Sequence, residues 1–150
     1  MEHREISFRG KRVDNGEWFE GFYAKSGEKT YIIYDNDIAV GYVSMKEVIP
    51  ETVGQYTGLT DKNGNKIFEG DILSERPPMN QIAYIGYVAY DEELAAWRFM
   101  IKNDTFNGVL LGSYSNSYKV IGNIHDTPEL LNGGVTDTNV GGKKKGGEQE

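Results

Sequence analysis

The sequence has no cysteine and only two histidines, His3 and His125, among its 150 residues. Without cysteine the chain can form neither a disulfide framework nor a cysteine-based zinc site, and it has no thiolate nucleophile. Nucleophilic catalysis by a serine or threonine would have to use one of the two histidines as its base. A reducing compartment, the cytoplasm, is the expected location.

Long apolar runs are also lacking. No stretch approaches the roughly 20 apolar residues needed to cross a bilayer, and the N-terminal "MEHREISFRG" does not have the pattern of a secretion signal. Positive charge is scarce too, because 16 Lys and Arg face 23 Asp and Glu, giving a net charge of −7. A protein that neutralises phosphates needs clustered Lys and Arg, so this balance disfavours a nucleic-acid partner without excluding a local basic patch.

What the chain does contain is short bursts of alternating apolar and polar residues, rich in its ten Tyr and six Phe. This alternation is typical of strands with two different faces, and Gly, Asn and Asp bound the bursts as turn formers do. The sequence therefore predicts a mainly β protein of short, twisted strands. The bursts are "EISFRGKRV", "EWFEGFYA", "TYIIYD", "IAVGYVSM", "KIFEGDIL", "IAYIGYVAY", "AWRFMIK" and "SYKVIGNI".

Helical signals are limited to two short segments. "SMKEVIPETV" predicts one turn of helix that starts at Ser44 and ends before Pro50, and "DTPELL" predicts a second that Asp126 caps, with Pro128 in its first turn. Both would connect strands. One or two short helices are thus expected beside the sheet.

Three tight turns are also predicted. Asn-Gly pairs lie in "DNG" (residues 14–16) and "KNG" (residues 62–64), and "DND" (residues 35–37) joins two apolar bursts. Asn-Gly favours the type I′ turn of a hairpin, in which both central residues have positive φ. We therefore expect a hairpin at each Asn-Gly pair.

The stretch "TDKNGNKIFEGDI" raises the question of a calcium loop. Asp61, Asn63 and Asn65 match ligand positions 1, 3 and 5 of an EF-hand. Position 6 should be glycine and is Lys66, position 12 should be glutamate and is Ile72, and the flanking residues predict strands. A hairpin turn is the better interpretation, and no metal site is assigned anywhere in the chain.

Candidate functional residues are few. His125 beside Asp126 is the one conceivable base with an orienting acid, yet a histidine at the end of a strand is more often a surface residue, so no catalytic or cofactor-binding residue is assigned. The candidate surface consists of Arg9, Arg12, Trp18 and His125. No cofactor is expected.

Three blocks of the sequence resemble the YopX family of phage and prophage proteins. They are "EISFRGKRVDNGEW", "SMKEVIPETVGQYTGLTDKNGNKIFEGDIL" and "LLGSYSNSYKVIGNIHDTPELL", with Thr127 where asparagine is common before Pro128. The resemblance implies a mainly β fold whose C-terminal half resembles an SH3-like barrel, and it implies a phage or prophage source in a bacterial host cell. It brings no established reaction and no catalytic residues.

The expected organisation is an N-terminal β-rich segment (residues 1–52) packed on or continuous with an SH3-like barrel region (residues 53–131), followed by a disordered tail (residues 132–150) rich in glycine and polar residues. The function expected first is a non-enzymatic binding or interaction module for an unknown host or phage protein. A nucleic-acid-associated phage protein and an enzyme of unrecognised type are the alternatives. Strand edges leave a homo-oligomer open as well.

Overall fold

The structure is a computed structural model that describes residues 3–37, 42–76, 79, 82–101, 108–112, 117–132 and 135–137. Within these ranges the chain is built from strands joined by turns and two short 3-10 helices. The predicted mainly β fold is therefore confirmed. None of the described helical segments has the length and apolar character that crossing a bilayer requires.

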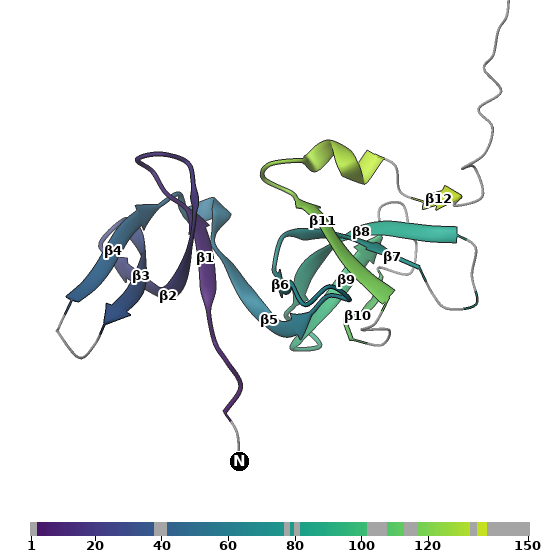
Figure 1. The fold of residues 1–150 in the computed structure, drawn as a ribbon, viewed down its shortest axis with the longest axis horizontal. Coiled ribbons are helices and arrows are strands. Elements are labelled where there is room, and N and C mark those ends of the chain that lie inside the picture. The colour runs from purple at the N-terminus through teal and green to yellow at the C-terminus, as the bar shows by residue number, and fades with distance from the viewer. Residues whose placement is uncertain are drawn as a thin grey trace, which may run out of the picture. The chain divides into compact units, whose positions relative to one another are not determined.

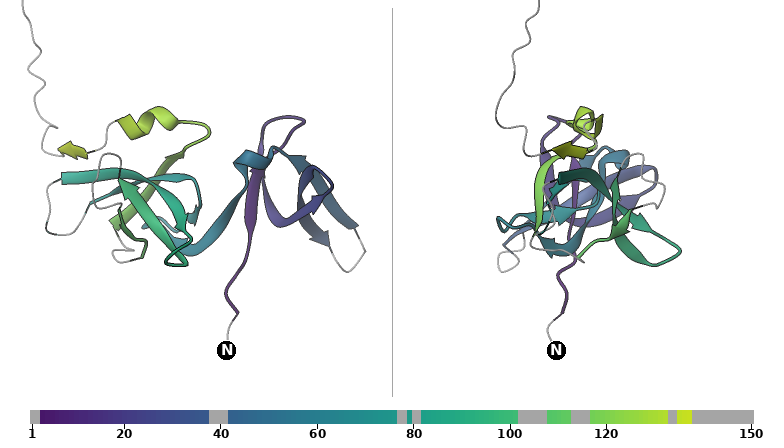
Figure 2. Two further views of the ribbon diagram at one scale, coloured as in Figure 1. Left: turned by 180° about the vertical axis from the view of Figure 1, so that it is seen from behind. Right: turned by 90° about the vertical axis from the view of Figure 1, so that its right-hand side faces the viewer.

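The elements lie in two antiparallel sheets, whose strands can be followed in Figures 1 and 2. The first sheet has the order β4-β3-β2-β1-β5-β6, and the second has the order β10-β9-β8-β7-β11, with β12 paired to β8. The first sheet contains β1 (Phe8–Lys11), β2 (Trp18–Ser26), β3 (Lys29–Asp37), β4 (Tyr42–Val48), β5 (Gly54–Thr60) and β6 (Lys66–Phe68), with the 3-10 helix η2 (Pro50–Thr52) between β4 and β5. The second contains β7 (Asp71–Glu75), β8 (Ile82–Asp91), β9 (Ala96–Ile101), β10 (Val109–Leu110), β11 (Tyr118–Asn123) and β12 (Val135–Asp137), with the 3-10 helix η4 (Pro128–Asn132).

The chain divides into two compact units. The first unit comprises residues 1–59 and 66–69, and the second comprises residues 60–65 and 70–150. The boundary runs through the β5–β6 hairpin, so the strands of this hairpin lie mainly in the first unit while its turn belongs to the second. Of the tail expected to be disordered, Asn132 ends η4 and residues 135–137 form β12, while 133–134 and 138–150 lie outside the described residues.

In the first unit, the end of β4 returns to the end of β1 and curls the sheet. Arg12 and Val48 form a bridge, the Ile49 N–H donates to the Lys11 carbonyl at 2.8 Å, and the Val13 N–H donates to the Glu47 carbonyl at 3.0 Å. The inner face carries the core, with Ile32 and Val48 almost completely buried. Gly10 makes room for this core, because a Cβ there would lie 2.9 Å from a methyl group of Val48.

In the second unit, the core lies between β7, β8, β9 and β11. Ile72, Leu73, Val88 and Phe99 are buried, and the Phe99 ring meets the Tyr118 ring edge-on at 5.4 Å between centroids. Such an aromatic pair packs well between pleated strands.

Several local predictions need correction. The segment 35–37 is not a turn, because it continues β3 with an irregular register opposite β4. Ser44 does not start a helix but lies in β4, and η2 begins at Pro50, where the missing N–H of proline costs no helical hydrogen bond. "KIFEGDIL" forms two strands instead of one, because Gly70 has a φ of 88° and turns the chain between β6 and β7.

The two Asn-Gly hairpins are present, but their turns are not of type I′. In each turn only the glycine has positive φ, 74° at Gly16 and 84° at Gly64, and Ala95 is the only non-glycine residue with positive φ in the described part of the chain. The second helix also differs in its start. It begins at Pro128, so Thr127 precedes it, while the Asp126 carboxylate accepts a hydrogen bond from Asn123.

Candidate binding surface

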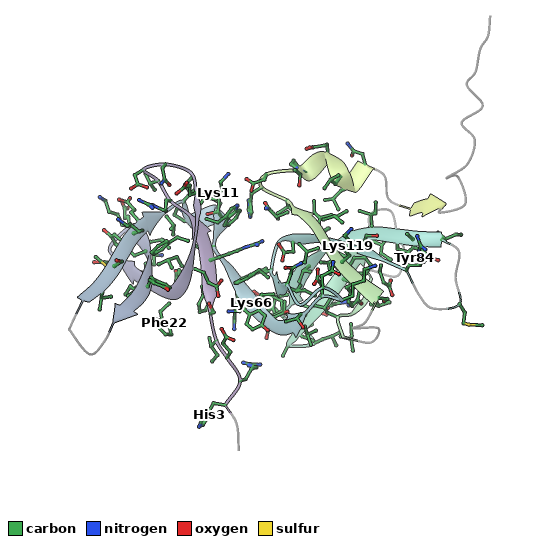
Figure 3. The ribbon with its side chains drawn as sticks, in the orientation of Figure 1. His3, Lys11, Phe22, Lys66, Tyr84 and Lys119 are labelled. Atoms are coloured by element: carbon green, nitrogen blue, oxygen red, sulfur yellow. The ribbon has the colours of Figure 1, made fainter. Side chains whose placement is uncertain are left out.

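The outer face of β2, β3 and β4 carries a row of apolar side chains, which we call the Phe22 ladder: Phe22, Ile33, Met45 and Val43. Phe22 on β2 is paired with Ile33 on β3, and Ile33 is paired with Met45 on β4. Val43 lies two residues before Met45 and therefore on the same face of β4. Phe22, Met45 and Val43 are 58%, 57% and 56% exposed. Figure 3 shows Phe22 projecting away from the ribbon of β2.

The Phe22 ladder is unusual because large apolar side chains on a sheet normally face a core. Singly exposed apolar residues are common, but adjoining ones on three paired strands form a patch of the kind that marks an interaction site. Among the neighbouring positions on the opposite face, Ile32 is buried, while Tyr23 and Tyr34 are 43% and 46% exposed. Strand β3 is therefore apolar on both faces, and only the face of Ile32 contributes to the core.

Of the residues predicted as a candidate surface, the structure brings Arg9 and Trp18 together. The Arg9 guanidinium carbon lies 4.6 Å from the centroid of the Trp18 ring and 4.8 Å from that of Phe68. The Lys11 ammonium lies 5.8 Å from the same Trp18 ring. These are cation–π distances, so the pair of cations stabilises the packing of aromatic rings in the first unit.

Arg12 and His125 do not join this cluster. The Arg12 guanidinium forms a two-pronged ion pair with Asp14, at 2.9 and 2.7 Å, and lies over the Phe19 ring. His125 belongs to the second unit and is half-buried in the turn after β11, where its backbone N–H donates to the Asn123 side-chain oxygen at 2.9 Å. Of the three candidates in the first unit, Arg9 and Trp18 thus lie together, while Arg12 is paired with Asp14.

The turn that resembles a calcium loop is held by its own aspartate. Asp61 Oδ1 accepts hydrogen bonds from the N–H groups of Asn63 and Asn65, and Oδ2 accepts from the Val120 N–H at 3.0 Å. Burial alone raises the pKa of Asp61, but these donors, led by Val120, outweigh it and the pKa lies below its ordinary value. The hairpin turn predicted here is confirmed, and the carboxylate serves the turn and β11.

A second buried carboxyl group, Glu75 on β7, lies in a different environment. Burial raises the pKa of Glu75, and the Ser117 hydroxyl, 3.5 Å away, lowers it only in part. In the described part of the chain, no group of three or more His, Asp and Glu side chains could hold a metal ion. The two buried acids, Asp61 and Glu75, therefore take part in the packing of the second unit.

The second unit also has a shallow depression of about 490 Å³ at the β8–β9 hairpin, lined by Tyr90, Asp91, Arg98 and Met100 among others. Arg98 donates to Asp91 at 2.9 Å and to the Gly108 carbonyl at 2.8 Å. Asp91 also accepts hydrogen bonds from the N–H groups of Glu93 and Leu94, so it closes the turn between β8 and β9. The Asp91 carboxylate and the two terminal nitrogens of Arg98 are thus engaged within the protein.

Sequence reasoning missed the Phe22 ladder, although the sequence carried a signal for it. The burst "TYIIYD" has apolar residues at adjacent positions, which places them on both faces of β3. A strand of this kind is normally covered on both sides. The strand pairing, which aligns Ile33 with Phe22 and Met45, could not be read from the sequence.

The fold and the exposed ladder define the class, a small mainly β protein with two antiparallel sheets and an uncovered apolar face. The chain belongs to the YopX protein family, whose pattern matches residues 7–132. A similar solved structure is the crystal structure of protein EF1440 from Enterococcus faecalis, with a TM-score of 0.50 and 24% sequence identity, covering 86% of this chain and 99% of that chain. That likeness concerns the fold. No curated protein matches the sequence.

Proposed function

We propose that this protein is a non-enzymatic binding module, encoded by a phage or prophage, that docks a host or phage protein in the bacterial cytoplasm. The Phe22 ladder is the observation that carries the proposal, because exposed apolar side chains of adjoining strands form the core of protein interfaces. Membership of the YopX family supports the phage or prophage source.

A nucleic-acid partner is less well supported because cations of the first unit are engaged with acids. Arg12 is paired with Asp14, and the Lys66 ammonium lies 2.7 Å from carboxylate oxygens of both Glu5 and Glu20. Binding to phosphates would require breaking these pairs, which lowers the net gain.

The proposal can be tested by affinity capture from lysate of phage-infected bacteria, with the full chain as bait. The bait variant Phe22→Ser/Met45→Ser removes the apolar centre of the ladder. A control, Leu94→Ser/Met79→Ser, removes two apolar side chains at turns of the second unit that are at least as exposed as Phe22 and Met45. We expect the same proteins to be retained by the wild type and the control and to be lost from the ladder variant, with or without nuclease.

Retention of the same proteins by the ladder variant would contradict the proposal. A catch that disappears on nuclease treatment would support the nucleic-acid alternative instead. Circular dichroism of each bait checks that the sheet is retained, so that loss of binding cannot be attributed to unfolding.

A further inference from the structure

Strand β4 is the outer strand of the first sheet, and one half of its free edge is already paired with another part of the chain. Residues 11–13 run antiparallel beside residues 47–49 on this edge. There the Glu47 carbonyl accepts a hydrogen bond from the Val13 N–H at 3.0 Å. The edge of β4 therefore has a geometry that a further strand can join.

The other half of this edge, at residues 43–45, presents unpaired backbone groups. Along a strand, successive residues alternate in the side to which their N–H and C=O groups point. The Glu47 carbonyl points to the free edge, so the groups of Met45 and Val43 point there as well, while those of Ser44 point to β3. Among the residues that the structure describes, none bonds to the outward groups of Val43 and Met45. Such an edge is a template for another strand.

The outward groups of β4 are complementary to themselves. When two copies of β4 lie antiparallel about a two-fold axis at Ser44, Val43 of each copy lies opposite Met45 of the other. Residues opposite each other in this way exchange both of their N–H···O bonds, so every outward group of the two residues is used. Moving the axis to Met45 would place Val43 opposite Glu47, whose carbonyl already accepts from Val13.

The side chains at this junction are compatible with the pairing. Residues 43–45 carry no charge, so no like charges lie directly opposite each other there. Val43 of one copy would lie beside Met45 of the other on the face of the Phe22 ladder, because opposite residues of an antiparallel pair share a face. On the other face, Ser44 would lie beside Ser44 of the second copy, with about 4.5 Å between their Cα atoms.

We propose that the chain forms a two-fold dimer in which β4 pairs antiparallel with β4 of a second copy, centred on Ser44. The first sheets of the two copies become one continuous sheet, and the two Phe22 ladders form one larger apolar face. A second copy suits this edge better than an unrelated strand, because the same two residues supply all donors and acceptors on both sides. The inference does not rest on the proposed function, since backbone groups hold the dimer and the ladder stays exposed.

The first test uses the lack of cysteine in the sequence. In Ser44→Cys the introduced thiols of two copies would lie opposite each other, at a Cα separation that a disulfide spans. On mild oxidation this variant should form a covalent dimer about tenfold faster than Ser26→Cys, because pairing raises the effective concentration of the thiols. Ser26 is the control, an exposed position on β2 in the same unit. Unfolding both variants in urea should abolish the difference.

The second test is analytical ultracentrifugation of the full chain. An interface of this size is weak, so the wild type should be dimeric at hundreds of micromolar and monomeric at low micromolar concentration. Met45→Pro removes an N–H that points to the free edge and leaves the pairing of β4 with β3 intact, so it should stay monomeric. Met45→Ala keeps this N–H and should weaken the dimer much less. Circular dichroism checks that each variant is folded.

Three results would each overturn the inference: a wild type that stays monomeric at hundreds of micromolar, equal dimerisation of Met45→Pro and Met45→Ala, or equal rates of cross-linking by the two cysteine variants. If Met45→Pro does not fold, the comparison of Ser44→Cys with Ser26→Cys decides. A monomeric protein that still retains its partners in the capture experiment would remove the dimer and leave the binding module in place.

Discussion

The two units of this protein bury different kinds of polar group. The buried polar residues of the first unit are Ser7, Thr30, Thr52 and Thr57, all with neutral hydroxyls, whereas those of the second are the acids Asp61, Asp71 and Glu75. A buried hydroxyl can donate its hydrogen bond to a nearby carbonyl, as the Thr57 hydroxyl does to the Ile67 carbonyl at 2.8 Å. A buried carboxylate needs several donors or a proton.

The difference teaches that the stability of the two units should respond differently to pH. The buried hydroxyls of the first unit do not titrate, although burial also raises the pKa of the half-buried Glu69 at the edge of this unit, so the pH dependence of the first unit should come from outside its core. In the second unit Asp61 has a lowered pKa and Glu75 a raised one, so the two acids impose opposite pH dependences.

The largest effect is expected in the neutral core of the first unit. Ile32→Ala removes a side chain with no exposed surface and should lower the free energy of unfolding by about 3 kcal/mol, because it leaves a cavity. The neighbouring substitution Ile33→Ala, on the half-exposed outer face, should cost less than about 1 kcal/mol. Urea unfolding at pH 5 and pH 8 measures the cost of each substitution. If the cost of Ile32→Ala differed between the two pH values, the first-unit core would not be independent of pH.

The second prediction concerns Asp61. Asp61→Ala leaves the N–H groups of Asn63, Asn65 and Val120 without their acceptor and should cost about 2 kcal/mol at pH 7. The pKa of Asp61 is lowered in the folded state, so this stability is present above the ordinary aspartate value of 3.8 and is lost as the pH falls through the folded value. The exposed Asp14→Ala is the control; an Asp61→Ala cost no larger than that of the control would refute the role of the carboxylate.

The third prediction returns to the first unit and its buried hydroxyls. Thr52 Oγ1 accepts from the Lys11 N–H at 2.9 Å and donates to the Ile49 carbonyl at 2.6 Å, which ties η2 to β1. Thr52→Val should cost about 1 kcal/mol at any pH between 5 and 8. Thr60→Val, at an exposed position of β5, should be nearly neutral in the same unfolding measurements.

The smallest effect is expected from Glu75, and it appears in the slope of the free energy of unfolding against pH. Its pKa is raised by burial, so its contribution to stability is present below the ordinary glutamate value of 4.5 and is lost as the pH rises through the folded value. The free energy of unfolding of the wild type should therefore contain a decrease due to this acid as the pH rises from 4 to 8, and Glu75→Gln should remove that decrease. Parallel stability curves for the two proteins over this range would show that Glu75 does not titrate there.

Much of the strand content could be predicted because alternation is a local property. "IAYIGYVAY" and "AWRFMIK" became β8 and β9, and the acids between them form the turn. Strand β5 was missed since "GQYTGLT" has two glycines, and its pairing with β1 depends on residues distant in sequence. The SH3-like character expected for residues 53–131 and the domain boundary at residue 52 stay predictions.

The candidate site was harder to predict than the fold. Arg9 and Trp18 meet because their strands pair in the hairpin predicted at residues 14–16, while Arg12 forms an ion pair with its sequence neighbour Asp14. Whether an apolar position faces a core or remains uncovered depends on the curl of the sheet. The alternation alone does not contain that information, so the sequence does not distinguish Phe22 and Met45 from core residues.

The path of the chain between the two units has a consequence for genetic dissection. Residues 60–65 and 66–69 belong to different units, so the backbone passes from one unit to the other at three places around a single hairpin. A gene fragment ending at Leu59 omits β6 from the first sheet, and one beginning at Gly70 omits the Asp61 turn that bonds to β11. Recombination cannot exchange either half cleanly at one crossover, which favours inheritance of residues 1–132 as one block.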